Sequence, residues 1–265
     1  MFRTSEVMQM TKERYSIGRS LAGATLLFVL VAPCSAQWVN YKARGVPRTA
    51  DGKPDLNAPT PKMTDGKPDF SGLWLGPRPY QTNLTKDLKP GELAMLPWAE
   101  ALFKQRRANE SKEDPQAYCI PGGVPRSYTP PYPFKIVSTP NLVVILFEAI
   151  QSYRQIFTDD RELPRELTPT WMGYSVGRWE EDTLIVQTTG FKDENWIDSD
   201  GHPGSDALVV TERFRRKDFG HMDIEVAIQD PKAYSKPWTI TLSLTAAPDN
   251  EIMEYICSEN NKYSR

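Results

Sequence analysis

Histidine and cysteine are scarce in this sequence, with two histidines and three cysteines among 265 residues. A zinc or copper site built from three histidines is therefore excluded. Cysteine pairs at the spacing of a zinc knuckle are missing, and so is a glycine-rich loop that could cradle phosphates. We therefore expect no metal, nucleotide or haem cofactor.

No apolar run reaches the roughly 20 residues that a membrane-spanning helix needs. The run at residues 21–32 is shorter, follows several basic residues and precedes the small residues Cys34-Ser35-Ala36. This order is typical of a signal peptide, here residues 1–36, with cleavage between Ala36 and Gln37. We therefore predict an exported protein, periplasmic or secreted, without a membrane span in its mature form. Attachment of a lipid to Cys34 is the alternative.

Neither sign of charge dominates, since 34 acidic residues stand against 32 basic ones. This balance is not typical of a nucleic-acid-binding protein. Two cysteines, Cys119 and Cys257, remain after the predicted cleavage. In an oxidising compartment a disulfide between them is the leading interpretation, and two separate buried thiols are the alternative.

Proline is abundant, and most of the 23 prolines fall within residues 47–79 and 115–140. Because proline fixes φ and offers no ladder donor, we interpret residues 37–134 as an arm of extended segments and turns wrapped over a core. Within this arm, Asp51-Gly52-Lys53-Pro54-Asp55 recurs at residues 65–69, which predicts one duplicated Asx-type turn. The helix-forming residues after Pro97 predict one helix at about residues 98–109.

The rest of the chain, residues 135–265, has the texture of an all-β meander, with short β-branched and aromatic runs between turn residues. Apolar and polar side chains alternate in several runs, so each strand has one dry and one wet face. Because closure removes exposed edges, we predict an antiparallel up-and-down β-barrel, with a two-sheet β-sandwich as the alternative. The predicted strands are residues 73–76, 135–138, 142–148, 153–158, 172–179, 183–189, 207–216, 222–229, 238–245 and 252–257.

One carboxylate falls on the dry side of a predicted strand. Alternation along residues 207–216 places Glu212 on the face of Leu208, Val210 and Phe214. A carboxylate inside a barrel is either paired with a cation or protonated with a raised pKa, and the second condition suits a general acid or base. The candidate cations are Arg154 and Arg178. A structural pair that fixes the strand register is the alternative to catalysis.

A long polar connection, residues 190–205, forms the second candidate site. Connections of this length inside a compact domain are often functional. If it covers the barrel mouth, His202 could relay protons, Trp196 could stack on a ligand, and Asp198 or Asp200 could orient the imidazole. The alternative is a surface loop in which the aspartates cap turns and His202 is solvated.

Several motifs resemble those of a widespread, uncharacterised family of exported bacterial proteins. They are the segments DGKPDFSGLW (65–74), GYSVGRW (173–179), GHP (201–203), VTERF (210–214) and DPKAY (230–234). That resemblance implies no particular activity. In addition, Gly72-Leu73-Trp74 is similar to the Gly-x-Trp opening of lipocalin-like barrels. This likeness implies an up-and-down barrel whose indole plugs the closed end and whose cup holds a small, partly apolar molecule, and some such barrels are cofactor-free lyases or isomerases.

Three functional hypotheses follow. The first is a metal-independent acid/base enzyme, a lyase, isomerase or hydrolase, in which Glu212 is the acid or base and Arg178 or Arg154 stabilises an anion. The second is a non-catalytic carrier whose Trp196, Trp171 and Tyr174 bind a hydrophobic ligand. The third is an envelope scaffold. The sequence specifies neither the ligand nor the oligomeric state.

Overall fold

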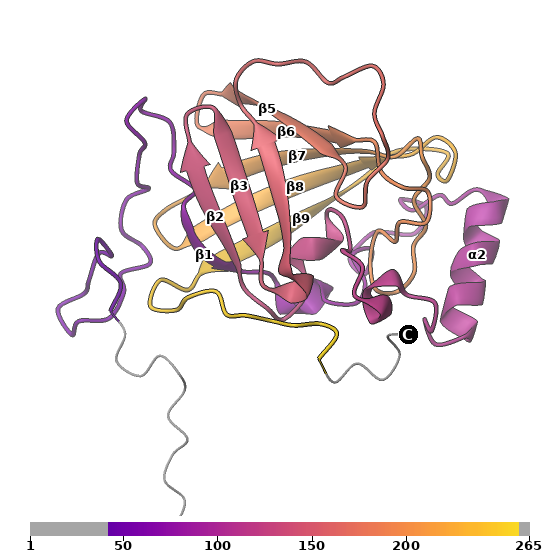
Figure 1. The fold of residues 1–265 in the computed structure, drawn as a ribbon, viewed down its shortest axis with the longest axis horizontal. Helices are drawn as coiled ribbons and strands as arrows, with labels where there is room; N and C mark the ends of the chain where they lie inside the picture. The colour runs from indigo at the N-terminus through magenta and orange to yellow at the C-terminus, as the bar shows by residue number, and fades with distance from the viewer. Residues whose placement is uncertain (1–41, 260–265) are drawn as a thin grey trace, which may run out of the picture. The chain divides into compact units, whose positions relative to one another are not determined.

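The computed structural model describes residues 42–259 (Figure 1). The predicted signal peptide, its cleavage site and Cys34 lie outside these residues. Within the described part of the chain, no helix is long and apolar enough to cross a membrane.

Nine strands close into one β-barrel, which confirms the predicted fold class over the sandwich. Closure is made by the short strand β1, which pairs with β2 on one side and with β9 on the other. The strands are β1 (Gly72–Leu75), β2 (Phe134–Thr139), β3 (Leu142–Phe147), β4 (Ser152–Phe157), β5 (Tyr174–Glu180), β6 (Thr183–Thr189), β7 (Val209–Arg216), β8 (His221–Gln229) and β9 (Trp238–Ala246) (Figure 1).

The barrel is not antiparallel throughout, because β4 and β5 run parallel. The prediction of a purely up-and-down order is therefore wrong at this one pair. Parallel neighbours need a long connection that carries the chain back, and residues 158–173 provide it as the wide excursion at the top of Figure 1. The predicted last strand, residues 252–257, is also wrong, since no strand forms there.

The interior is filled largely by apolar and aromatic side chains. Buried and exposed residues alternate along β9, and the same period places the apolar residues of β8 inside. On β1, Trp74 is fully buried, donates from Nε1 to the Phe70 carbonyl at 3.0 Å, and lies 4.9 Å under the Arg216 guanidinium. The short helix η3 (Arg126–Tyr128) inserts Tyr128 among the aromatic rings of Phe134, Phe147 and Phe214.

The arm contains the predicted duplicated turn. In the first copy the Thr49 N–H bonds to the Lys53 carbonyl at 2.9 Å, and in the second copy Met63 bonds to Lys67 at 2.8 Å. The second copy is an Asx turn, since Asp65 accepts from the Lys67 N–H at 3.0 Å. The glycine of each copy has a positive φ, which explains why glycine recurs at this place.

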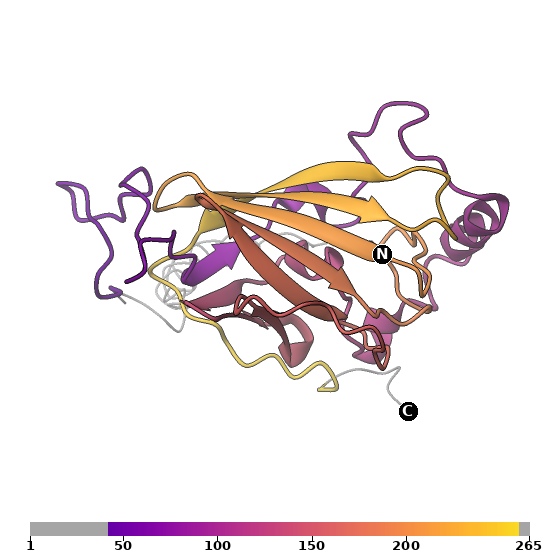
Figure 2. The same cartoon turned by 90° about the horizontal axis from the view of Figure 1, so that it is seen from above.

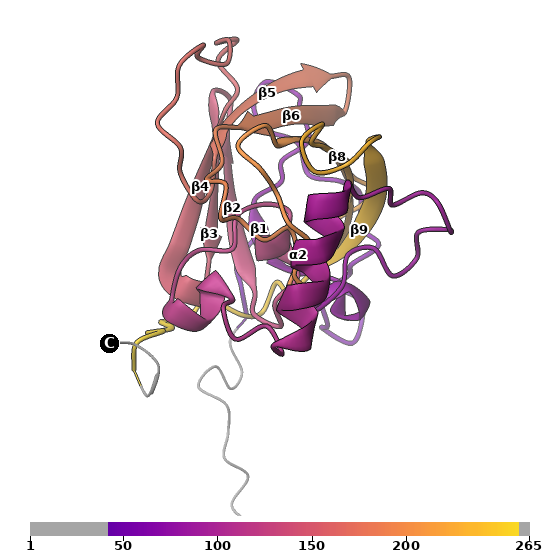
Figure 3. The same cartoon turned by 90° about the vertical axis from the view of Figure 1, so that its right-hand side faces the viewer.

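Helix α2 (Pro97–Ala108) confirms the predicted helix and lies at one end of the barrel (Figure 3). It begins with proline, whose missing N–H costs nothing at a helix start. Trp98 anchors it by donating from Nε1 to the Lys232 carbonyl at 2.6 Å. The helix covers the connection between β6 and β7, which contains His202.

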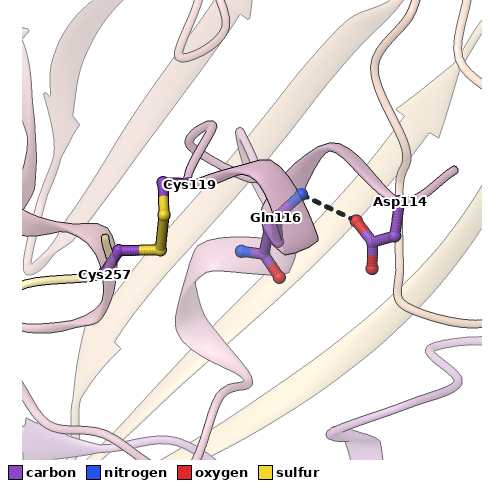
Figure 4. Close-up of a disulfide and its surroundings, with 4 residues drawn as sticks. All are labelled: Asp114, Gln116, Cys119 and Cys257. Atoms are coloured by element: carbon purple, nitrogen blue, oxygen red, sulfur yellow. Dashed lines mark hydrogen bonds between the residues drawn. A yellow bond between two sulfur atoms is a disulfide. The ribbon is translucent and has the colours of Figure 1, made fainter. Parts of the chain in front are cut away.

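The carboxy-terminal segment, residues 247–259, runs along the outside of the barrel (Figures 1 and 2). Lys135 bonds to Glu251 at 2.6 Å, and the Met253 N–H bonds to Glu148 at 2.9 Å. The segment is then held by the predicted disulfide, Cys119–Cys257, which joins it to the arm next to helix η2 (Pro115–Tyr118) (Figure 4).

Candidate functional site

A buried ion pair lies in the barrel interior, between Glu212 of β7 and Arg154 of β4. Both side chains are almost fully buried, which confirms that Glu212 faces inward. The contact is bidentate: Arg154 donates from Nη1 to Oε1 at 3.0 Å and from Nη2 to Oε2. Since β4 and β7 are not neighbours in the sheet, this pair joins two separated parts of the barrel wall.

A shell of hydroxyl groups completes the pair. Arg154 donates from Nε to Ser175 at 3.0 Å, from Nη2 to Thr188 at 2.6 Å, and from Nη1 to Tyr128. The Tyr128 hydroxyl in turn donates to Glu212 at 2.9 Å. All five N–H groups of the guanidinium are thereby used.

Burial and these contacts keep the Tyr128 hydroxyl and the Arg154 guanidinium protonated. Burial raises the pKa of Tyr128 well above its usual value, so the hydroxyl stays protonated. Burial works to lower the pKa of Arg154, but the charges and hydrogen bonds of Glu212 and Tyr128 together outweigh it, so the pKa is raised and the arginine stays charged. This cluster of Glu212, Arg154, Tyr128, Ser175 and Thr188, which we call the interior network, is saturated with its own hydrogen bonds.

Arg178, the other candidate cation, is outside the barrel. Its side chain is 69% exposed and lies 3.2 Å from Glu180. The two-residue period of β5 explains the error, because Ser175 and Gly177 face inward and Arg178 therefore faces out. The prediction that Arg178 stabilises an anion in the interior is wrong.

His202 is neither a proton relay at an open mouth nor a solvated residue, because it is buried under α2. Its Nδ1 lies 2.7 Å from Asp198 Oδ2, and its ring stacks on Phe103 with centroids 4.2 Å apart. The predicted orientation of the imidazole by an aspartate is confirmed for Asp198. The other ring nitrogen lies 3.5 Å from the Thr85 hydroxyl.

Asp198 also fixes the backbone around it. Its carboxylate accepts N–H groups of Leu84, Gly201 and His202. Burial works to raise the pKa of Asp198, but the hydrogen bond and charge of His202 and the backbone N–H groups of Leu84 and His202 together outweigh it, and the pKa is lowered. Because a buried carboxylate with these partners is ionised, Asp198 acts as a structural brace of the connection.

Because the pKa of Asp198 is lowered in the folded protein, we predict that the stabilisation from this carboxylate is lost at low pH. With a lowered pKa in the folded state, the contribution of Asp198 is complete above the unfolded value of about 3.9 and disappears as the pH falls through the folded pKa. Asp198→Asn should cost ~1.5–3 kcal/mol of unfolding free energy at pH 7, and clearly less at about pH 2.5. Urea unfolding at both pH values measures this, and an equal loss at both would contradict it.

The side chains of Trp196 and Asp200 contact other residues of the protein. The Trp196 ring lies 4.3 Å from the guanidinium of Arg106 and 5.9 Å from that of Arg126, and it is buried. Asp200 accepts from Asn83 at 2.9 Å. The prediction that Trp196 stacks on a ligand is wrong, because its ring is buried beside these arginines where residues 190–205 pack against α2.

A pocket of about 540 Å³ opens instead between β4 and β5. These two strands pair only at Ile156 with Ser175 and at Phe157 with Val176, and the residues before those pairs diverge. The pocket reaches the interior network at Arg154 and Ser175. It also contains two residues predicted to bind a ligand, Trp171 and Tyr174, but not Trp196, Asp198, Asp200 or His202.

Two residues of the pocket wall have an unusual backbone conformation that the sequence does not indicate. Ile150 and Gln151 line it with left-handed backbones, at φ 61° and 46°, and for a β-branched residue this conformation is strained. Strained residues cluster at functional sites. No sequence pattern distinguishes Ile150, since only its backbone is unusual.

Ser175 was not among the predicted site residues, although the sequence around it has a recognisable motif. It is the central serine of Gly173-Tyr174-Ser175-Val176-Gly177, the spacing of a hydrolase nucleophile elbow. In an elbow the serine sits on a turn between a strand and a helix, whereas Ser175 lies inside β5. Its hydroxyl bonds to Arg154 and lies 3.0 Å from Thr188 Oγ1. The structure therefore gives Ser175 a place in the interior network and in the pocket wall, without the geometry of a nucleophile.

Comparison of the chain with family models, with curated proteins and with solved structures gives no match. Among residues 42–259, no three histidine, cysteine, aspartate or glutamate side chains are grouped as metal ligands. Function is therefore inferred from the geometry of the barrel and its pocket.

Proposed function

We propose that this protein is a non-catalytic carrier that binds a small, partly apolar ligand in the pocket between β4 and β5. The observation that carries the proposal is a pocket of about 540 Å³ in the barrel wall, within the roughly 300–1,000 Å³ typical of small-molecule sites. Aromatic side chains, Phe157, Trp171 and Tyr174, supply a ligand wall, and Phe157 stacks on Tyr174 with centroids 5.3 Å apart.

The acid/base enzyme is less well supported. That hypothesis needs Glu212 to exchange a proton with a bound molecule and an arginine to offer free donors. Both Glu212 oxygens accept hydrogen bonds, and every Arg154 donor is used within the interior network. We therefore assign the network the task of holding the barrel wall behind the pocket.

We also propose that the carrier works outside the cytoplasm. The leader pattern of residues 1–36 supports export. The Cys119–Cys257 disulfide fits an oxidising compartment, where such bonds persist. Detection of the mature amino terminus at Gln37 in an extracytoplasmic fraction tests this part of the proposal.

Binding of the neutral fluorescent probe N-phenyl-1-naphthylamine tests the pocket. Trp171→Ala removes one aromatic wall and should weaken probe binding by ~1–2 kcal/mol, roughly five- to thirtyfold. The matched control is Trp98→Ala, which removes an exposed indole on α2, outside the pocket lining. Fluorescence titration measures both, and equal affinities of the two variants would overturn the proposed site.

A further inference from the structure

The pocket has an unusual wall, because one side of it is the edge of a β-strand. On one side β4 pairs with β3 along its whole length, from Ser152 to Phe157. On the other side β5 pairs only with Ile156 and Phe157. No other strand of the described chain pairs with the first four residues of β4, 152–155, on this side, so they form a free edge that faces the pocket.

The register fixes which main-chain groups this edge presents. In an antiparallel pair, alternate residues turn their N–H and C=O groups toward the partner strand. The bond from the Thr158 N–H to the Asn141 carbonyl sets the phase, so Ser152 and Arg154 bond toward β3. Tyr153 and Gln155 consequently point their main-chain groups away from β3 and into the gap.

Part of this edge is already used. The parallel pair of Ile156 with Ser175 engages the Gln155 carbonyl, in the pattern expected of a parallel ladder. Within residues 42–259 the two ladders leave three groups for a ligand, namely the N–H and C=O of Tyr153 and the N–H of Gln155. They are spaced as one antiparallel strand would need them, and the edge from residue 152 to 155 is about 10 Å long, the length of three extended residues.

The charged residues of the pocket lining indicate whether the ligand carries a charge. Among the described residues that line the pocket, Arg154 is the one charged side chain, and its charge is compensated by Glu212. Arg161 and Lys192 lie over the rings of Phe157 and Trp171 but do not belong to the lining, so the lining itself offers no unpaired charge to a carboxylate or ammonium group. The apolar walls are Ile150, Phe157, Trp171 and Met172.

From these observations we infer that the ligand of the pocket is a short, extended and uncharged peptide segment that adds to the free edge of β4. This inference rests on the proposed function and specifies its ligand. Addition of a strand uses main-chain hydrogen bonds for affinity and side-chain pockets for selectivity. A peptide of three residues would continue the sheet into the gap that β5 leaves open.

The probe for this inference is the blocked tripeptide acetyl-Val-Phe-Val-amide, titrated into the disulfide-bonded protein by calorimetry. Its fully N-methylated analogue keeps the side chains but has no backbone donor at the three residues. We expect the parent peptide to bind at least tenfold more tightly than the analogue, because main-chain bonds are lost. Equal affinities would overturn the inference.

A proline at position 155 tests the same edge from the side of the protein. Gln155→Pro removes one of the two N–H groups that point into the gap and leaves the β3 ladder intact, as proline does on edge strands. Peptide affinity should fall roughly tenfold, whereas Gln155→Ala, which keeps the N–H, should bind as the unaltered protein does. An equal loss in both variants would mean that the Gln155 side chain, not the strand edge, binds the peptide.

The neutral probe separates this inference from the proposed function. If N-phenyl-1-naphthylamine binds and the tripeptide does not, the pocket is a small-molecule site and the peptide inference is wrong. If neither binds, both proposals are wrong. Retained probe binding by Gln155→Pro shows that the pocket is intact, and if that variant does not fold, the N-methyl comparison on the unaltered protein decides.

Discussion

Glu212→Ala is expected to lower the free energy of unfolding by ~3–5 kcal/mol, because it leaves the Arg154 guanidinium buried without its counter-charge. The Tyr128 hydroxyl loses its acceptor in the same variant. Urea unfolding followed by circular dichroism measures the loss. We also expect weaker probe binding, since Arg154 belongs both to the interior network and to the pocket wall.

Two further variants show whether this loss comes from the uncompensated charge. Arg178→Ala breaks an exposed ion pair of the same type and should cost less than ~1 kcal/mol. The double variant Glu212→Leu with Arg154→Met removes both charges and should recover much of the stability, because apolar residues of similar volume often replace a buried pair without penalty. A Glu212→Ala loss no larger than that of Arg178→Ala would contradict the assigned role.

Loss of the disulfide is the second large effect that we expect. Cys119 and Cys257 are 138 residues apart in the sequence, so their bond restricts a long loop of the unfolded chain. Replacing both cysteines by serine should therefore lower the free energy of unfolding by ~2–5 kcal/mol. The measurement is urea unfolding of the oxidised protein and of the double variant.

Reduction of the unaltered protein provides the matched control. Dithiothreitol should destabilise it by about as much as the double substitution does, and should leave the double variant unchanged. An unaltered protein that is equally stable with and without reductant would show that the carboxy-terminal segment is held by its other contacts, such as Lys135 with Glu251 and Met253 with Glu148.

Much of the barrel could be predicted from local patterns. Strict alternation along residues 207–216 was sufficient to predict that Glu212 faces inward, because a period of two fixes the face of every second residue. The same reasoning failed for Arg178, since β5 combines small and large residues, Gly177 beside Trp179, and no clear apolar side distinguishes its faces. In the structure the cation that pairs with Glu212 is Arg154.

The connection between β6 and β7 shows what the sequence could not specify. Its aspartates and its histidine are typical of a polar surface loop, yet Asp198 and His202 are buried. Their partners, Leu84 and Phe103, lie about a hundred residues earlier in the chain. Only tertiary packing brings these segments together, and single-sequence patterns do not describe it.

The pocket could not be predicted for a related reason. It depends on the parallel pairing of β4 and β5 at two positions, and a sequence pattern gives the existence of strands but not their partners. Trp171 and Tyr174 were nevertheless predicted as ligand contacts from their residue types. Both lie in the wall of the pocket.

The most direct test of a ligand pocket between β4 and β5 is a titration of the ¹⁵N-labelled protein with N-phenyl-1-naphthylamine, observed in amide and indole correlation spectra. We predict shifts of the Trp171 indole N–H and of the amides of Tyr153, Gln155 and Ser175, with the Trp98 indole unchanged. Shifts confined to residues outside the gap between β4 and β5, or no shifts at saturating probe, would contradict the claim.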